Sequence, residues 1–465
     1  MRYSLTIFLL LIVAVSAVQV GAGPAEGADW LLVGARIVTV DPDHHVLENG
    51  AIAIRRGRIL AVGPRADLER KYSGKRVNLT GKLVMPGLVN THTHAAMTLY
   101  RGLADDLALQ EWLEKYIFPA ESRFTTADFV EWGSKLACLE MIRGGTTTFA
   151  DMYYFEDQVA KAAAEAGIRG VLGETIIHIP APDFKTPEET LRFTETFLKR
   201  WQGHPLVVPA VAPHSIYLLP AATLQASAKL ARDHHAPILI HLSETKKEVE
   251  DSRREHGLSP VAYLEKLGVL GPDVLGAHGV SVDAKDIALL QKHGAAIAHN
   301  PSSNMKLGSG VAPVVEMLKA GVVVGLGTDG AAGNNDLNMF EEMDLAAKLH
   351  KLHLGDPRAL PARQALEMAT ILGARALGMG KEIGSLEAGK KADLIVVALD
   401  TAHAVPLYNV ESQIVYALKA SDVESVMVDG RWVMRNRKIL TLDEQKVLRQ
   451  ARQYADKVRA SLGLH

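Results

Sequence analysis

The sequence has a single cysteine, Cys138, among its 465 residues. One thiol cannot form an internal disulfide and cannot build a zinc site from several thiolates. An excess of charge of one sign is also missing, since 51 Lys and Arg oppose 53 Asp and Glu for a net charge of −2. Without a basic run or arm, nothing favours a nucleic-acid partner. The remaining composition, 48% hydrophobic and 22% charged, is typical of a globular protein with a large core.

Long hydrophobic runs are absent after the first thirty residues. At the start, Arg2 precedes an uncharged segment from Leu5 to Val18, and small residues follow it. This order is typical of a secretory signal. The alternative is an uncleaved membrane anchor, but a spanning helix needs about 20 apolar residues. We therefore expect residues 1–22 to be a signal peptide, cleaved after Ala17 or Ala22, and the mature protein to be periplasmic or secreted, without membrane association.

Both ends of the mature chain carry short alternating segments that predict β-strands. Near the start, two such segments flank Arg56-Gly57, a dipeptide typical of a hairpin turn. Segments near residues 392–398 and 423–434 show the same pattern. We expect residues 23–85 and 383–440 to form two parts of one small β-sandwich, and residues 441–465 to form a C-terminal helix.

Residues 86–382 alternate short apolar runs with helical segments such as 127–143, which Thr126 and Gly144 bound. Parallel βα units with reactive residues at the carboxyl ends of the strands are the layout of a (β/α)₈ TIM barrel. A doubly wound open sheet is the alternative, but no Gly-x-Gly-x-x-Gly turn follows the first strand. The expected α/β fold is therefore a barrel plus the small sandwich. The eight runs end at His92/His94, Asp151, Glu174, His214, His241, His278, His299-Asn300 and Asp329.

Histidine is abundant, with 18 residues, and its placement indicates a metal site. His92 and His94 are two residues apart on one expected strand, so their imidazoles point to the same face. His241 and Asp329 end two other strands of the same barrel. Three imidazoles and a carboxylate fit zinc or iron(II), with room for a water molecule. Such an ion lowers the pKa of its bound water far below that of bulk water, toward about 7.

Glu244 and His278 are the candidates for proton chemistry beside that metal. Glu244 follows His241 by three residues, and it could be either a helix-opening carboxylate or a general acid and base. His278 could be a buried core histidine or could orient the attacking hydroxide. Asp329 precedes a glycine and could be only a turn residue. Its place at the end of the eighth strand favours a functional role.

Several of these motifs together resemble the amidohydrolase superfamily. They are Pro86-Gly-Leu-Val-Asn-Thr-His-Thr-His-Ala, His241-Leu-Ser-Glu-Thr, Asn300-Pro-Ser-Ser-Asn-Met-Lys-Leu-Gly, Gly327-Thr-Asp-Gly-Ala-Ala-Gly-Asn-Asn and Gly384-Ser-Leu-Glu-Ala-Gly-Lys-Lys-Ala-Asp-Leu-Ile-Val. The resemblance is strongest to the 5′-methylthioadenosine/S-adenosylhomocysteine deaminases and their chlorohydrolase relatives. It covers nearly the whole mature chain.

The resemblance implies one divalent metal per chain, with zinc expected first and iron second, held by His92, His94, His241 and Asp329. It also implies that Glu244 protonates a purine ring nitrogen, while His278 and Asp329 activate water and Asp329 passes a proton to the departing ammonia. No lysine ends the fourth strand, which disfavours a carbamylated lysine between two metals.

For substrate binding, the resemblance implies that Trp112 lines a purine pocket, Glu121 accepts the ribose hydroxyls and His214 contacts the nucleoside. Family members that hold the homocysteine tail place an arginine where Glu174 stands in this chain. We therefore expect Glu174 to face the 5′ substituent and to disfavour the carboxylate of S-adenosylhomocysteine.

The sequence thus predicts a metal-dependent hydrolase that releases ammonia from an amino-substituted N-heterocycle, most readily an adenosine-type nucleoside. Alternatives on the same fold are guanine or pterin deamination and displacement of chloride or an amine from a triazine. A different class, an exported binding protein without turnover, is disfavoured by the intact set of proton-transfer residues. The expected partner is a small heterocyclic substrate, and homo-oligomer formation stays open.

Overall fold

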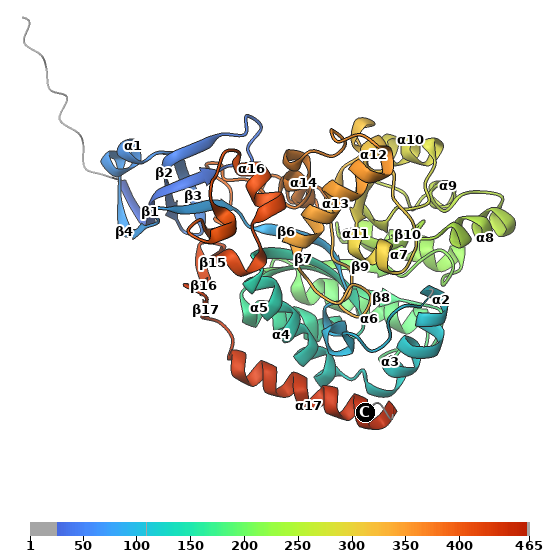
Figure 1. Cartoon of the computed structure of the whole chain (residues 1–465). Helices are drawn as coiled ribbons and strands as arrows, with labels where there is room; N and C mark the ends of the chain where they lie inside the picture. The colour runs from blue at the N-terminus through green and yellow to red at the C-terminus, as the bar shows by residue number, and fades with distance from the viewer. Residues whose placement is uncertain (1–25, 108, 463–465) are drawn as a thin grey trace, which may run out of the picture.

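A computed structural model describes residues 26–107 and 109–462 of the chain (Figure 1). The expected signal peptide, residues 1–22, lies outside these ranges. Among the described helices, none is both long enough and apolar enough to cross a membrane. The described residues fold around two sheets, one of eight strands and one of nine.

The eight-stranded sheet is the expected barrel. Its strands are parallel neighbours in sequence order, from β6 to β13. The first and last strands meet where the backbone N–H of Asp329 donates to the carbonyl of His92 at 2.9 Å. The strands are β6 (Leu88–Thr93), β7 (Thr146–Tyr153), β8 (Arg169–Ile176), β9 (Val207–Pro213), β10 (Ile238–Leu242), β11 (Val274–His278), β12 (Ala296–His299) and β13 (Val324–Leu326).

Helices surround the barrel, and capping residues mark where some of them begin. The helix α4 spans Ala127–Arg143, as the sequence predicts, because the Thr126 hydroxyl accepts the N–H of Phe129 at 3.2 Å. The other helices of the barrel region are α2 (Leu109–Trp112), α3 (Phe118–Phe124), α5 (Glu156–Ala166), α6 (Pro187–Trp201), α7 (Ala221–Asp233), α8 (Lys246–His256), α9 (Pro260–Lys266), α10 (Ala284–His293), α11 (Pro301–Lys306), α12 (Val314–Lys319), α13 (Met339–Leu354), α14 (Ala362–Met368) and α15 (Ile371–Ala376).

The second sheet combines strands from both ends of the chain, as expected (Figure 1). Its two halves join where β5 and β14 pair antiparallel, with Met85 opposite Ile395. Arg56 and Gly57 form the predicted hairpin turn, with φ of 51° and 77°. The strands are β1 (Glu26–Val38), β2 (Val46–Arg55), β3 (Arg58–Pro64), β4 (Tyr72–Asn78), β5 (Lys82–Pro86), β14 (Leu394–Ala398), β15 (Val423–Val428), β16 (Arg431–Arg435) and β17 (Lys438–Ile439). The helices outside the barrel are α1 (Arg65–Lys71), α16 (Val410–Ser412) and the C-terminal α17 (Glu444–Leu462).

A buried ion pair connects the barrel to this terminal sheet. Arg169, at the start of β8, lies 3.1 Å from Asp393, and their side chains are 1% and 2% exposed. Arg169 also donates to the carbonyl of Pro205 at 2.7 Å, and Asp393 accepts the N–H of Asp429 at 2.7 Å. Each of the two charged groups therefore has a backbone hydrogen-bond partner in addition to the other group. Losing one partner would leave the other buried and uncompensated.

We predict that Arg169→Met lowers the free energy of unfolding by about 3–5 kcal/mol, because Asp393 then stays buried without its cation. Urea denaturation of the wild type and the variant measures the difference. The matched control is Arg58→Met, whose ion pair with Glu382 is 48% and 43% exposed. An exposed pair of this kind contributes about 1 kcal/mol or less. Equal losses in the two variants would contradict the role given to Arg169.

Candidate active site

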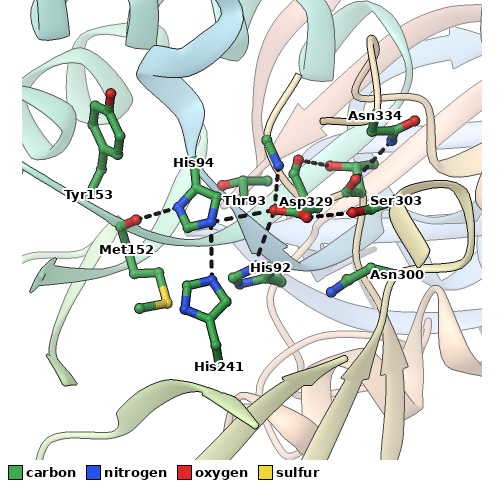
Figure 2. Close-up of polar contacts among 12 residues, drawn as sticks. His92, Thr93, His94, Met152, Tyr153, His241, Asn300, Ser303, Asp329 and Asn334 are labelled. Carbon is green, nitrogen blue, oxygen red and sulfur yellow. Dashed lines mark hydrogen bonds and ion pairs between the residues drawn. The ribbon is translucent and has the colours of Figure 1, made fainter. Parts of the chain in front are cut away.

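The predicted metal ligands converge at the carboxyl ends of the barrel strands (Figure 2). The Nε2 atoms of His94 and His241 lie 3.2 Å apart. Oδ1 of Asp329 lies 3.5 Å from Nε2 of His92 and 3.4 Å from Nε2 of His94. The strands β6 and β10 and the turn after β13 thus bring four predicted ligands to one point.

The hydrogen bonds around the imidazoles fit a divalent metal. Nδ1 of His94 donates to the carbonyl of Met152 at 2.6 Å, and Nδ1 of His241 donates to the carbonyl of His214 at 2.9 Å. These bonds leave the Nε2 lone pairs free to coordinate, the usual arrangement of metal-binding histidine. Nε2 of His92 is buried and has no hydrogen-bond partner among the residues that the structure describes. A buried polar atom without a partner is costly, and a metal ion would supply the missing contact.

Burial also keeps the imidazoles of His92 and His241 neutral, which coordination requires. Desolvation lowers the pKa of His92 to about 4. The same cause, aided by the charges of neighbouring histidines, lowers the pKa of His241 well below its ordinary value. Neutral imidazoles with free Nε2 atoms therefore present lone pairs at neutral pH.

The predicted ligand Asp329 is held both by its own turn and by the neighbouring helix α11. Ser303 donates its hydroxyl to Oδ2 of Asp329 at 2.7 Å, and the N–H of Gly330 donates to Oδ1 at 2.7 Å. The backbone of Asp329 adopts a φ of 62°, in the left-handed region. Asn90 holds the preceding residue, since Thr328 N–H donates to its amide oxygen at 3.0 Å. Strained residues of this kind persist at sites where the surroundings over-determine them.

Asp151, two residues before the end of β7, fixes the segment that carries His94. Its Oδ1 lies 2.5 Å from the Thr93 hydroxyl and accepts the N–H of Ala95 at 2.6 Å. The two residues on either side of His94 are thereby held to the neighbouring strand. Together with the bond to Met152, these contacts leave the His94 ring little freedom.

Glu244 and His278 face each other beside the ligand cluster. Oε2 of Glu244 lies 3.9 Å from Nε2 of His278, and the side chains are 8% and 1% exposed. Nδ1 of His278 donates to the side-chain oxygen of Asn304 at 3.0 Å, which orients the ring. Burial raises the pKa of Glu244 above its ordinary value. A carboxyl group whose pKa is raised by burial is better suited to give a proton as a general acid than an exposed one.

A cavity opens over this cluster, and three predicted substrate-binding residues line it: Trp112, Glu121 and His214. Glu121 is buried and accepts the hydroxyl hydrogen of Tyr153 at 2.6 Å. Burial raises the pKa of Glu121 to about 7. Trp112 donates its indole N–H to the carbonyl of Ala104 at 3.1 Å, so the ring is held against the cavity wall. The Trp112 ring and the Glu121 carboxyl group therefore line the same cavity as the predicted metal ligands.

Glu174 does not line this cavity, so the prediction that it faces the 5′ substituent is wrong. Its side chain is fully buried, and its Oε2 accepts the N–H of Glu156 at 2.8 Å. Successive side chains on a strand point to opposite faces, and the next residue, Thr175, lines the cavity instead. Burial also raises the pKa of Glu174 well above its ordinary value. The expected repulsion of a homocysteine carboxylate therefore has no structural basis.

Other residues of the site carried no prediction. Tyr153 and Thr175 line the cavity, while Ser303 and Asn304 support Asp329 and His278. The last two lie in the motif that begins at Asn300, so the motif marked their segment without indicating their roles. Tyr153 follows Asp151 by two residues on β7, and that same-face spacing was the available signal.

Fold and site together define a barrel hydrolase with a histidine-rich metal site, and comparison with known proteins specifies the family. The Amidohydrolase family matches residues 83–433. A relative from Syntrophobacter fumaroxidans, called 5-methylthioadenosine/S-adenosylhomocysteine deaminase, is 49% identical over 93% of this chain and 99% of its own length. A Methanosarcina mazei relative called 5′-deoxyadenosine deaminase is 44% identical over 93% of this chain and 99% of its own.

A solved structure gives the same result. An adenosine deaminase from Xanthomonas campestris with bound zinc superimposes with a TM-score of 0.92 at 37% identity, covering 94% of this chain and 100% of that one. The chain therefore belongs to the amidohydrolase family. It is a hydrolase of the deaminase type, acting on carbon–nitrogen bonds in cyclic amidines, and it resembles the methylthioadenosine/S-adenosylhomocysteine deaminases as the sequence predicts.

We predict about one tightly bound divalent metal per chain, zinc before iron, because the three imidazoles and Asp329 form one four-ligand cluster. Metal analysis of the purified protein by mass spectrometry gives the count. His94→Ala should lose most of the metal, whereas His353→Ala, an exposed histidine on α13, should keep it. Two metals at full occupancy, or an unchanged content in His94→Ala, would contradict this assignment.

Proposed function

We propose that the protein is a metal-dependent deaminase of adenosine-type nucleosides, with 5′-methylthioadenosine and adenosine first and S-adenosylhomocysteine as a further member of the class. The observation that carries this proposal is the placement of Glu244, His278 and Glu121 around one cavity above the metal ligands. The relatives named for nucleoside deamination support the substrate class.

The residues divide into metal ligands and proton-transfer groups. The divalent ion would be held by His92, His94, His241 and Asp329. Its chemistry is to lower the pKa of a bound water toward about 7. Glu244 gives a proton to the purine ring nitrogen beside the carbon that carries the amino group. Protonation there makes this carbon a better electrophile, and the raised pKa of Glu244 suits it to that step.

His278 and Asp329 act on the side of the attacking water. His278 is held by Asn304 so that its Nε2 points toward Glu244, which leaves this edge available to hydrogen-bond an oxygen that develops on the substrate carbon. Asp329 accepts hydrogen bonds from Ser303 and Gly330, so its carboxylate has a fixed direction. A carboxylate placed this way takes a proton from water and delivers it to the departing ammonia.

The nucleoside part of the proposal rests on Glu121. It lines the same cavity as Glu244 and the metal ligands, and Tyr153 occupies only its Oε1. The second oxygen can then accept ribose hydroxyls, as carboxylates do in other nucleoside sites. A guanine, pterin or triazine has no ribose to engage this group, so Glu121 favours a nucleoside over these alternatives. A purely ligand-binding protein would need no buried acid beside a metal cluster.

We predict that ammonia release will be fastest from adenosine-type nucleosides. A panel of 5′-methylthioadenosine, adenosine, S-adenosylhomocysteine, adenine, guanine, a pterin and an aminotriazine tests the substrate class. Adenine is the matched control, because it carries the same reacting carbon without the ribose. We expect kcat/KM for adenosine to exceed that for adenine by about tenfold or more, equivalent to about 1.4 kcal/mol of transition-state binding. Guanine or a triazine as best substrate would overturn the nucleoside assignment.

We predict that Glu244→Gln keeps the fold and the metal but lowers kcat by about 10²–10⁴-fold, because it removes only the transferable proton. Steady-state ammonia release, with metal content and thermal unfolding measured alongside, checks this. Glu250→Gln removes the same charge from an exposed position on α8 and should behave as wild type. A Glu244→Gln enzyme within a few-fold of the wild-type kcat would exclude Glu244 from the proton transfer.

A further inference from the structure

Glu248, in the first turn of α8, makes contacts that its position in the sequence does not predict. Thr245 caps the helix, and its hydroxyl accepts the N–H of Glu248 at 3.2 Å. In a capping box the glutamate three residues later returns to the N–H of the capping residue itself. Here its two oxygens instead accept the N–H of Ser243 at 3.0 Å and the N–H of Glu244 at 2.7 Å. The Glu248 carboxylate therefore binds the turn that precedes the helix, in place of the N–H group of the capping residue.

That turn has a conformation that needs support. Ser243 adopts a φ of 51°, in the left-handed region that L-residues with a side chain rarely occupy. Its carbonyl accepts the N–H of Ser281 at 2.8 Å, while the carbonyl of Leu242 accepts the N–H of Gly279 at 3.0 Å. The turn after β10 is thus joined to the turn after β11, which directly follows His278. Glu248 holds the opposite, N–H side of the same turn.

Glu248 lies near the reacting groups without being one of them. It is 6% exposed and lines an outer cavity between α8 and the 109–118 segment, whereas the inner cavity over the metal ligands does not include it. Glu244 lines both cavities. A group in this place can set where the Glu244 carboxylate points, although it does not touch the atoms that react.

We propose that Glu248 is a positioning residue, whose carboxylate fixes the Ser243–Glu244 peptide so that the Glu244 carboxyl faces His278 at 3.9 Å. The inference rests on the proposed function, because it gives Glu244 the proton transfer. Without Glu248, the two N–H groups lose their acceptors and Ser243 can relax out of the left-handed region. The substrate would then still bind in the same cavity, but the Glu244 carboxyl would no longer direct its proton toward the ring nitrogen.

The test compares Glu248→Ala, which removes both acceptors, with Glu248→Gln, which has nearly the same shape and keeps one acceptor oxygen. We expect Glu248→Ala to lower kcat by about tenfold or more with KM within about threefold, because positioning acts on the transition state rather than on ground-state binding. Glu248→Gln should recover part of this loss. Glu250→Gln on the same helix is the charge-matched control and should keep wild-type kcat and KM.

Crystal structures of wild type and both variants form a second arm that does not depend on activity. In Glu248→Ala we expect φ of Ser243 to leave the left-handed region and the Glu244 carboxyl to move away from His278. If Glu248→Ala does not fold, Glu248→Gln provides both the kinetic constants and the crystal structure. A kcat within twofold of wild type, or an unchanged Ser243–Glu244 turn, would overturn the proposal. A wild type that releases no ammonia from any nucleoside would count against the proposed function alone, since the crystal structures would still decide the role of Glu248.

Discussion

The site depends on the closure of the barrel, where the first and last strands meet at the metal cluster. The N–H of Asp329 donates to the carbonyl of His92 at 2.9 Å, so one backbone hydrogen bond joins two predicted ligands directly. Of the remaining predicted ligands, His94 directly follows β6 and His241 lies on β10 across the barrel. Because parallel strands of a closed barrel all present their carboxyl ends on one face, ligands far apart in sequence are brought within coordination distance.

Around this junction, hydrogen bonds from neighbouring strands and turns fix each functional side chain in one orientation. Carbonyls of Met152 and His214 orient two imidazoles, and Ser303 orients the aspartate. The backbone is left-handed at Asp329, and also at two further non-glycine residues near the site, Ser243 and His278. Each such residue costs about 1–3 kcal/mol, which the surrounding contacts must offset. Strained backbone of this kind is typical of active sites, where the surrounding contacts keep it in place.

Much of this arrangement could be predicted from the sequence, because strand ends and caps are local features. The eight parallel strands and the 127–143 helix follow from periodicity and capping, and the structure confirms them. The strand ends agree less well, since β7 and β8 continue two residues past Asp151 and Glu174, and β13 ends three residues before Asp329. The prediction for Glu174 failed for an equally physical reason. Knowing that a strand ends near a residue does not say which face it occupies, and a shift of one residue exchanges the two faces.

Contacts between distant segments were also beyond prediction. Tyr153 reaches Glu121 across 32 residues of sequence, and Arg169 pairs with Asp393 across 224. Glu248 matches the capping-box pattern, yet its carboxylate serves the preceding turn, because the tertiary contacts of that turn leave two N–H groups within its reach. Sequence patterns therefore predicted which residues form the site, whereas the orientation of each side chain followed only from the folded structure.

The central claim is that a purine nucleoside binds with its reacting carbon over the metal cluster and its ribose toward Glu121. A crystal structure with purine riboside, which hydrates at the reacting carbon and so mimics the tetrahedral intermediate of deamination, tests it most directly. The claim predicts that Glu244 lies within hydrogen-bonding distance of the adjacent ring nitrogen, that His278 and Asp329 contact the new hydroxyl, and that Glu121 contacts the ribose. A purine ring bound elsewhere, or bound with its ribose directed away from Glu121, would contradict it.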